Sequence, residues 1–343
     1  MTALAAAFAL FVVLSVVFSD DPATSMRALP SLSLFLLLPI SIDLVDSVRR
    51  ARTIVLAVAA SGTAMALLGL VQLARGGAHL QSRIHANLSH YMTLSGLTLL
   101  AGCVLLGYFF EGRGRQRWVG LAALVPFAAM VFTLTRGAYV GAVAAVAAYL
   151  ALRRPLGLLV LAPALVAIFL LLPAGVRGRA ASIADTADTT NRDRIAMADA
   201  GVRMIADRPI FGLGPELVKP YYTLYRDPDA PRWRVPHLHD NVLQIAAANG
   251  VFTAAVYLGL LALFFARAAR LLRRNVDRTP VGDRTLVAAA AFLGVAAATV
   301  AGLFEYNFGD KEVLMATLLL LALPFSRGMT ESGEAEHSPR IQS

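Results

Sequence analysis

Two histidines close the longest polar interval of the chain, and their side chains could carry out acid–base chemistry. His237 and His239 are separated by one residue and are followed by Asp240 and Asn241. An imidazole titrates near neutral pH, so one of the two could act as a general base. The same His-x-His spacing also fits a metal site, although few other histidines could add a ligand. A structural role within a loop is the third possibility, and the spacing alone does not decide among the three.

Arginine is the second residue type with chemistry to offer. Arg136 lies between two apolar runs, where an unpaired cation costs about 2.5–3.5 kcal/mol or more at mid-bilayer. Gly137 follows it and lets a ligand or another backbone approach closely. Fixed cations there would suit a phosphate, although an arginine that extends to the membrane surface has the same sequence pattern. Arg192 and Arg194 form a second cationic stretch, which could also be only the solvated face of a helix.

Both histidines belong to the polar interval 173–241, which lies between hydrophobic spans. It contains nine Arg, one Lys and nine acidic residues, so we expect a folded segment outside a membrane. Apolar residues recur within it at helical spacing: Ile195, Ala198, Val202 and Ile205. This pattern predicts a helix from about 191 to 207, ended by Pro209, whose apolar face packs on the membrane body.

The composition indicates that the rest of the chain is embedded in a membrane. Of 343 residues, 57% are hydrophobic and 15% are charged, against roughly 25% charged in an average soluble domain. The net charge of +9 falls mostly in short runs between apolar spans, where basic residues set membrane orientation. We therefore predict contact with membrane lipids and no nucleic-acid partner. The single cysteine, Cys103, excludes an intrachain disulfide.

Apolar runs predict about ten transmembrane helices, so the expected fold is an all-α polytopic membrane helix bundle with one long, partly helical loop. The predicted spans are residues 3–18, 29–45, 53–73, 89–110, 118–134, 138–152, 156–172, 242–266, 284–304 and 313–325. The expected division is N-terminal transmembrane helices over 1–172, the loop with the catalytic segment over 173–240, C-terminal transmembrane helices over 241–326 and a disordered cytoplasmic tail over 327–343.

The positive-inside rule predicts the orientation of this bundle. Arginine gathers in the links expected to face the cytoplasm: 46–52, 111–117, 153–155 and 266–283. The short links between them are poorer in basic residues, and a long translocated loop is exempt from the rule. The N- and C-termini are therefore predicted to be cytoplasmic, and the outer face is predicted to carry Arg136, both histidines, Glu305 and Asp310.

Four segments together resemble the O-antigen ligase family, polytopic enzymes that also include O-antigen polymerases. The first is Thr135–Ala138, which is similar to an S/T-R-G-A motif, and the second is Arg194 followed by Pro209–Gly214, which is similar to an Arg about fifteen residues before P-L-x-G-x-G. The third, His239–Gln244, is similar to H-N-x-x-L-Q. The fourth, Gly302–Asp310, is similar to a late segment of many members. Their order on one predicted face makes the resemblance more specific than any one motif, and it covers about residues 80–325. Asp240 stands where the family often has Asn.

The resemblance implies a metal-independent, cofactor-free glycosyltransferase of the bacterial inner membrane, with its loop and active face periplasmic. The donor would be an undecaprenyl-diphosphate-linked glycan. The acceptor would be a lipid A core in a ligase, or a growing glycan in a polymerase. A transporter is a third reading, less favoured because few charged residues lie within the spans.

The resemblance also implies roles for particular residues. His239 would be the general base, with His237 as the alternative base, while Arg136 and Arg194 would grip the diphosphate. Further side chains are expected to contact substrate on the same face: His237, Asn241, Arg192, Glu305 and Asp310.

Overall fold

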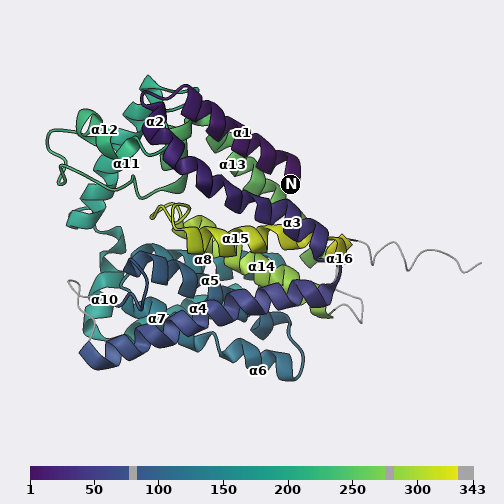
Figure 1. The fold of residues 1–343 in the computed structure, drawn as a ribbon. Helices are drawn as coiled ribbons and strands as arrows, with labels where there is room; N and C mark the ends of the chain where they lie inside the picture. Colours follow the sequence, from purple (N-terminus) through teal and green to yellow (C-terminus); the bar gives the residue numbers. More distant parts are fainter. Residues whose placement is uncertain (77–82, 275–281, 331–343) are drawn as a thin grey trace, which may run out of the picture.

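The computed structural model describes residues 1–76, 83–274 and 282–330 (Figure 1). Every regular element in these ranges is helical, which confirms the all-α prediction. The first elements are α1 (Thr2–Val17), α2 (Pro22–Ser25), the 3₁₀ helix η1 (Met26–Leu36), α3 (Leu37–Leu44), α4 (Val48–Gly76), α5 (Tyr91–Glu111), α6 (Arg115–Leu121), α7 (Leu124–Phe132) and α8 (Arg136–Arg153). The later elements are α9 (Gly157–Leu171), α10 (Ala174–Ala181), η2 (Ser182–Ala184), α11 (Thr189–Asp207), α12 (Val218–Tyr225), α13 (Asn241–Arg274), α14 (Gly282–Ala301), α15 (Lys311–Ala322), η3 (Leu323–Phe325) and α16 (Arg327–Thr330).

Helix α14 lies at the centre of the bundle because its side chains are small. Its alanine-rich segment 286–295 is buried throughout. Helix α5 approaches it at Gly107, where a Cβ atom would lie 2.6 Å from the backbone of Ala290. Helix α8 approaches it at Gly141, where a Cβ would lie 2.6 Å from the carbonyl oxygen of Ala297. Such close approach supplies the van der Waals contact on which helix association in a membrane depends.

Within the described ranges, five helical segments are long and apolar enough to cross a membrane: Pro22–Leu44, Val48–Gly76, Tyr91–Glu111, Asn241–Arg273 and Asp283–Ala301. Helices α1 and α9 are apolar but shorter. The predicted count of about ten spans is therefore not confirmed. The run 118–134 is broken into α6 and α7 at residues 122–123. Helix α15 has 12 residues, which is about 18 Å at 1.5 Å per residue, against a hydrocarbon core of about 30 Å.

The arginine-rich links lie together at one end of the bundle. Arg153 donates from Nε to Oε1 of Glu111 at 3.2 Å and from Nη1 to the carbonyl of Leu272 at 2.8 Å. Gln116 donates to Asp283 at 2.8 Å. Residues from three of the predicted cytoplasmic links are therefore neighbours, although part of one of these links, 275–281, lies outside the described residues. The side of the membrane that this end faces stays a prediction.

The tail predicted to be disordered over 327–343 begins with a short helix, α16. The amide of Gly328 donates to the carbonyl of Val45 at 2.8 Å, and Arg327 pairs with Asp43 at 2.6 Å. These contacts join α16 to the end of α3. Residues 331–343 lie outside the described residues.

The polar interval forms α10, η2, α11 and α12 at the other end of the bundle, on the left in Figure 1. The helix expected at about 191–207 is α11. It begins where the carboxylate of Asp188 accepts the backbone N–H groups of Thr190 and Asn191. This N-cap satisfies donors that the first turn leaves unpaired.

The apolar face predicted for α11 is wrong at Ile195 and Val202, whereas Ile205 is half-buried and packs against the core. Ile195 and Val202 are 52% and 57% exposed, whereas Met197 and Met204 are buried. The buried face also contains Gly201, where a Cβ would lie 2.8 Å from the Leu238 side chain. Small residues on this face allow the segment before α13 to pack closely, and that fit outweighs the hydrophobicity of the opposite face.

Candidate active site

A cavity of about 370 Å³ opens among the first turns of α5, α8 and α11 and the segments that precede α13 and α15. Five arginines line it: Arg83, Arg136, Arg179, Arg194 and Arg232. Among the described residues His90, His237 and His239 also face it, together with Glu305 and two aspartates. Cations in this number suit a polyanionic ligand, and the histidines add groups that can exchange protons.

His239 lines the cavity and is oriented by a carboxylate. Its Nδ1 lies 2.9 Å from Oε2 of Glu305, which comes from the link between α14 and α15 and is 7% exposed. With Nδ1–H donating to that carboxylate, Nε2 carries the free lone pair. The backbone of His239 has a φ of 53°, a left-handed conformation that costs about 1–3 kcal/mol in a residue other than glycine. The fold thus maintains strain at the residue best placed to act as a base.

His237 is placed differently from His239. Its Nδ1 accepts the backbone N–H of His239 at 3.2 Å, and its Nε2 lies 3.5 Å from Oε1 of Glu305. Burial is the main influence that lowers the pKa of His237 to about 4, against the opposing charge of Glu305. Both of its nitrogens have protein neighbours, and the neutral ring binds a proton weakly near neutral pH. This geometry favours His239 over His237 as the base.

Glu305 is the residue that links the histidines to an arginine. Besides both imidazoles, its Oε2 lies 4.0 Å from Nη2 of Arg194. Burial alone would raise the pKa of Glu305, but the hydrogen bond from His239 and the nearby positive charges outweigh it and hold the pKa below its ordinary value. Glu305 was predicted to contact substrate. In the structure it lines the cavity and positions other side chains.

Arg194 projects from the first turns of α11 and keeps donors for a ligand. Its side chain is 19% exposed, and the long 4.0 Å contact with Glu305 leaves most of its N–H groups facing the cavity. Burial lowers the pKa of Arg194, and the neighbouring Arg136 and Arg83 act in the same direction. A guanidinium under this repulsion gains most from an anion that enters the cavity.

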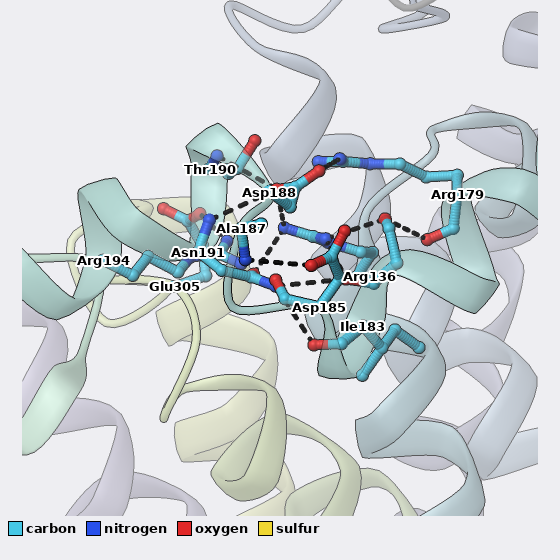
Figure 2. Close-up of polar contacts among 11 residues, drawn as sticks. Arg136, Arg179, Ile183, Asp185, Ala187, Asp188, Thr190, Asn191, Arg194 and Glu305 are labelled. Atoms are coloured by element: carbon cyan, nitrogen blue, oxygen red, sulfur yellow. Dashed lines mark hydrogen bonds and ion pairs between the residues drawn. The ribbon is translucent and has the colours of Figure 1, made fainter. Parts of the chain in front are cut away.

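Arg136, at the start of α8, is already occupied by protein acceptors, as Figure 2 shows. Its Nη1 donates to the carbonyl of Ser182 at 2.6 Å and to the Ser182 hydroxyl at 2.9 Å. Its Nη2 donates to Asp188 at 3.0 Å and to Oδ1 of Asn191 at 2.6 Å. The Arg136 side chain is 3% exposed. It therefore fastens the loop to α8 at the edge of the cavity.

Arg179 is a cavity cation that the motifs did not single out. It lies on α10 and pairs with the second oxygen of Asp188 at 3.5 Å (Figure 2). Burial lowers the pKa of Arg179, followed by the charges of Arg136 and Arg83. Arg83, whose guanidinium lies 4.4 Å from the ring centre of Tyr91, was missed as well. The sequence signal available was only the excess of arginine in polar links, which does not distinguish these positions.

Three further residues predicted to contact substrate differ in whether they line the cavity. Asn241 is 3% exposed and donates from Nδ2 to Asn307 at 2.7 Å, while its Oδ1 accepts the N–H of Phe308 at 3.1 Å. It therefore ties the start of α13 to the link before α15. Arg192 is exposed and outside the cavity lining. Asp310 does line the cavity, and burial raises its pKa to about 6.

Asp240, the position where the family pattern often has Asn, acts as a helix cap. Its Oδ1 accepts the backbone N–H of Leu243 at 2.8 Å in the first turn of α13. Both Asp and Asn are favourable in this capping role. The substitution therefore preserves the local geometry that places His239 immediately before the helix.

The site also contains the donor set for a cation. Ligand atoms of His237, His239 and Glu305 lie within 4.8 Å of one another. Two imidazoles and one carboxylate are suitable ligands for zinc and related metals. A metal there would compete with the hydrogen bond that orients His239, so base catalysis and metal binding are alternatives at this site.

Comparison with known proteins supports the resemblance. The family model described as O-antigen ligase matches residues 121–258. The matched segment runs from the end of α6 into α13 and includes Arg136, Arg194 and His239, whereas Glu305 lies beyond it. No curated protein matches the chain. The match covers less than half of the chain, and the apolar helices agree with the membrane location that the resemblance implies.

Proposed function

We propose, from the match of residues 121–258 to the O-antigen ligase family, that this chain is an inner-membrane glycosyltransferase. It transfers a glycan from an undecaprenyl-diphosphate-linked donor to an acceptor hydroxyl, with inversion at the anomeric carbon. The observation that carries the proposal is the His239–Glu305 pair beside a cavity lined by arginines. It combines a base with a site for a diphosphate leaving group, the two parts that the reaction needs.

His239 is the general base of the proposed reaction. Its Nε2 takes the proton of the acceptor hydroxyl as the oxygen attacks the anomeric carbon. Glu305 accepts Nδ1–H, fixes the tautomer and stabilises the imidazolium that forms, as the buried acid of a catalytic triad does. Glu305 is therefore a positioning residue in this mechanism.

The departing diphosphate is stabilised by the cavity arginines. As the bond between the anomeric carbon and the phosphate oxygen breaks, its electron pair moves to that oxygen. Arg194 is the main donor to the growing charge because its N–H groups are not saturated by the protein. Arg179 lies beside it and supplies a second cation. Arg136 acts indirectly in the proposal, because it holds the loop that carries Arg194.

The proposed orientation places this chemistry on the periplasmic face and the termini in the cytoplasm. The support is the clustering of the arginine-rich links at the other end of the bundle. A cysteine introduced at the half-buried Arg226 of the polar interval should react with an impermeant thiol reagent added to intact spheroplasts, and one at the exposed Arg49 should not. The opposite labelling pattern would reverse the orientation.

Transfer by the purified protein tests the activity directly. An undecaprenyl-diphosphate-linked oligosaccharide is offered with and without a lipid A core acceptor, to the wild type and to His239→Ala. Transfer to the core indicates a ligase, and elongation of the donor alone indicates a polymerase. We expect His239→Ala to lose transfer in either case, while His85→Ala, which changes an exposed histidine outside the cavity, keeps it.

Two results would contradict the proposal. Wild-type activity in His239→Ala would remove the base. Loss of transfer in a chelator, with recovery on adding zinc, would replace base catalysis by metal chemistry at His237, His239 and Glu305.

A further inference from the structure

A second cavity of about 220 Å³ adjoins the first and has a different chemical character. It lies between α1 and η1 on one side and α12, α13 and α15 on the other. Pro236 and His237 line both cavities, so the segment that carries the two histidines is a shared wall. A ligand in the second cavity would therefore lie against the segment that carries the base.

The floor of this second cavity is aromatic and apolar. The rings of Phe8 and Phe35 stack with centroids 4.7 Å apart, and Phe308 lies 5.7 Å and 5.9 Å from them. Val12 and Leu32 extend the same surface. Because α1 and η1 are apolar helices, this floor suits a hydrocarbon chain that enters from the lipid.

The rim of the second cavity carries mainly positive charge. The chain contains two lysines, Lys219 and Lys311, and both line this cavity. Both are exposed, and neither forms an ion pair with any residue that the structure describes. Glu216 on the same rim leaves a net positive charge. An ammonium is a compact donor that suits a phosphate oxygen.

A buried acceptor atom in the cavity wall lacks a partner. Oδ1 of Asn249 is buried and accepts no hydrogen bond from the residues described, although Asn249 lines the cavity. An amide oxygen left in this state costs about 1–3 kcal/mol. A ligand hydroxyl would satisfy it. The cavity thus joins an apolar floor, two cations and a hydrogen-bond acceptor for a hydroxyl.

We propose that this second cavity binds the acceptor of the transfer reaction, a membrane-anchored glycan whose lipid anchor carries phosphate. The lipid chain would lie on the phenylalanines, the phosphate at Lys219 and Lys311, and a sugar hydroxyl at Asn249. The acceptor glycan then passes His237 toward His239, while the donor diphosphate occupies the arginine cavity. This assignment builds on the proposed function and gives each substrate its own site.

Photocrosslinking tests binding without requiring turnover. Benzoylphenylalanine replaces Ser31, which lines the cavity, and in the control it replaces Ser33, an exposed residue of the same helix outside the cavity. The probe is radiolabelled lipid A carrying a core oligosaccharide, with no donor present. We expect crosslinking from position 31 at several times the yield from position 33, reduced when the phosphates of the probe are removed.

Steady-state kinetics test the lysines. We expect Lys219→Gln/Lys311→Gln to raise the KM for the phosphorylated acceptor about tenfold and to leave kcat and the donor KM unchanged. With a dephosphorylated acceptor the same double variant should have no further effect. Arg27→Gln/Arg234→Gln removes the same charge from exposed positions outside both cavities and should change neither KM.

The outcomes separate this inference from the proposed function. Equal crosslinking at positions 31 and 33, or an unchanged acceptor KM in the lysine variant, would overturn the acceptor site. Stronger competition by undecaprenyl diphosphate than by lipid A core at position 31, or a raised donor KM, would assign the cavity to the donor. Phosphate-dependent crosslinking in a protein that transfers no glycan would uphold the binding site and reject the glycosyltransferase.

Discussion

Arg136 and Arg194 belong to the same cavity, and the sequence suggests the same role for both, yet their surroundings differ. Arg136 is saturated by Ser182, Asp188 and Asn191 and is 3% exposed. Among the residues that the structure describes, Arg194 has one loose ionic contact, with Glu305 at 4.0 Å, and its side chain is 19% exposed. Figure 2 shows both arrangements in one view.

These contacts distinguish two regions of the site: a structural region, which holds the polar loop in place, and a reacting region, which carries the proposed catalytic groups. In the first, Arg136 and its partners join the polar loop to α8. In the second, Arg194, Glu305 and His239 leave donors and a lone pair directed at the cavity. A motif therefore predicts where an arginine lies. The protein groups that this arginine contacts determine whether it stabilises the fold or stays available to bind substrate.

Removing Arg136 should produce the largest effect, and it should be structural. In Arg136→Ala the carboxylate of Asp188 and the carbonyl of Ser182 each lose one of their donors, and breaking a buried pair in this way costs about 3–5 kcal/mol. We expect hydrogen exchange over residues 182–191 to accelerate strongly, with transfer lost as a consequence. Arg203→Ala removes an exposed pair with Asp227 and should cost less than about 1 kcal/mol.

The same hydrogen-exchange measurement can contradict this difference in role between Arg136 and Arg194. A loop that stays protected in Arg136→Ala while transfer is lost would mean that Arg136 acts on substrate. Arg136 and Arg194 would then share one role, as their motifs suggest.

Removing Arg194 should leave the structure intact and reduce catalysis. Arg194→Gln takes one donor from the departing diphosphate, which lowers the rate about 10²- to 10³-fold. Thermal stability should hold or rise, because burial of this cation is only partly offset by Glu305. Arg203→Gln, an exposed position on the same helix, is the matched control. Rates within twofold of wild type would place the diphosphate elsewhere.

Changing the charge of Glu305 tests the reacting region more finely. In Glu305→Gln the amide oxygen still accepts Nδ1–H of His239, but it no longer stabilises an imidazolium, so kcat should fall about 10²-fold. The donor KM should stay near the wild-type value. A donor KM that rises more than kcat falls would indicate that Glu305 serves mainly to hold Arg194 in place.

Sequence patterns predicted the helical class and much of the cavity because apolar runs and short motifs are local signals. Arg194, His239, Glu305 and Asp310 do line one cavity. The partners of Arg136 could not be predicted, since Asp188 and Asn191 carry no periodicity that points to α8. The inverted face of α11 has a similar cause, because close packing at Gly201 depends on the position of Leu238.

The predicted number of spans is not confirmed for a related reason. Hydropathy reports how apolar a run is, but it does not report where a helix breaks. Residues 122–123 interrupt one predicted span, and η3 and α16 follow a short α15 in another. Local turns of this kind are decided by packing against α5 and α4, which a sequence window does not contain.

The smallest expected effect is a pH dependence of the free energy of unfolding. It tests the different roles proposed for the two histidines. Burial lowers the pKa of His237 from 6.5 to about 4, so the folded protein holds this ring neutral where the unfolded chain would protonate it. The resulting stability is complete above pH 6.5 and is lost as the pH falls through about 4. Allowing for solvent screening at a side chain that is 23% exposed, its size is about 1–2 kcal/mol.

His237→Asn lacks this titration, so its melting temperature relative to that of the wild type should rise as the pH falls from 6.5 to about 4. The asparagine oxygen can still accept the N–H of His239, so transfer at neutral pH should remain within a few fold of wild type. Thermal melts of both proteins between pH 4 and 7.5 give the difference curve, which should bend between pH 6.5 and 4. A flat difference curve combined with lost transfer would make His237 the base, and His239 would then be the residue that holds it.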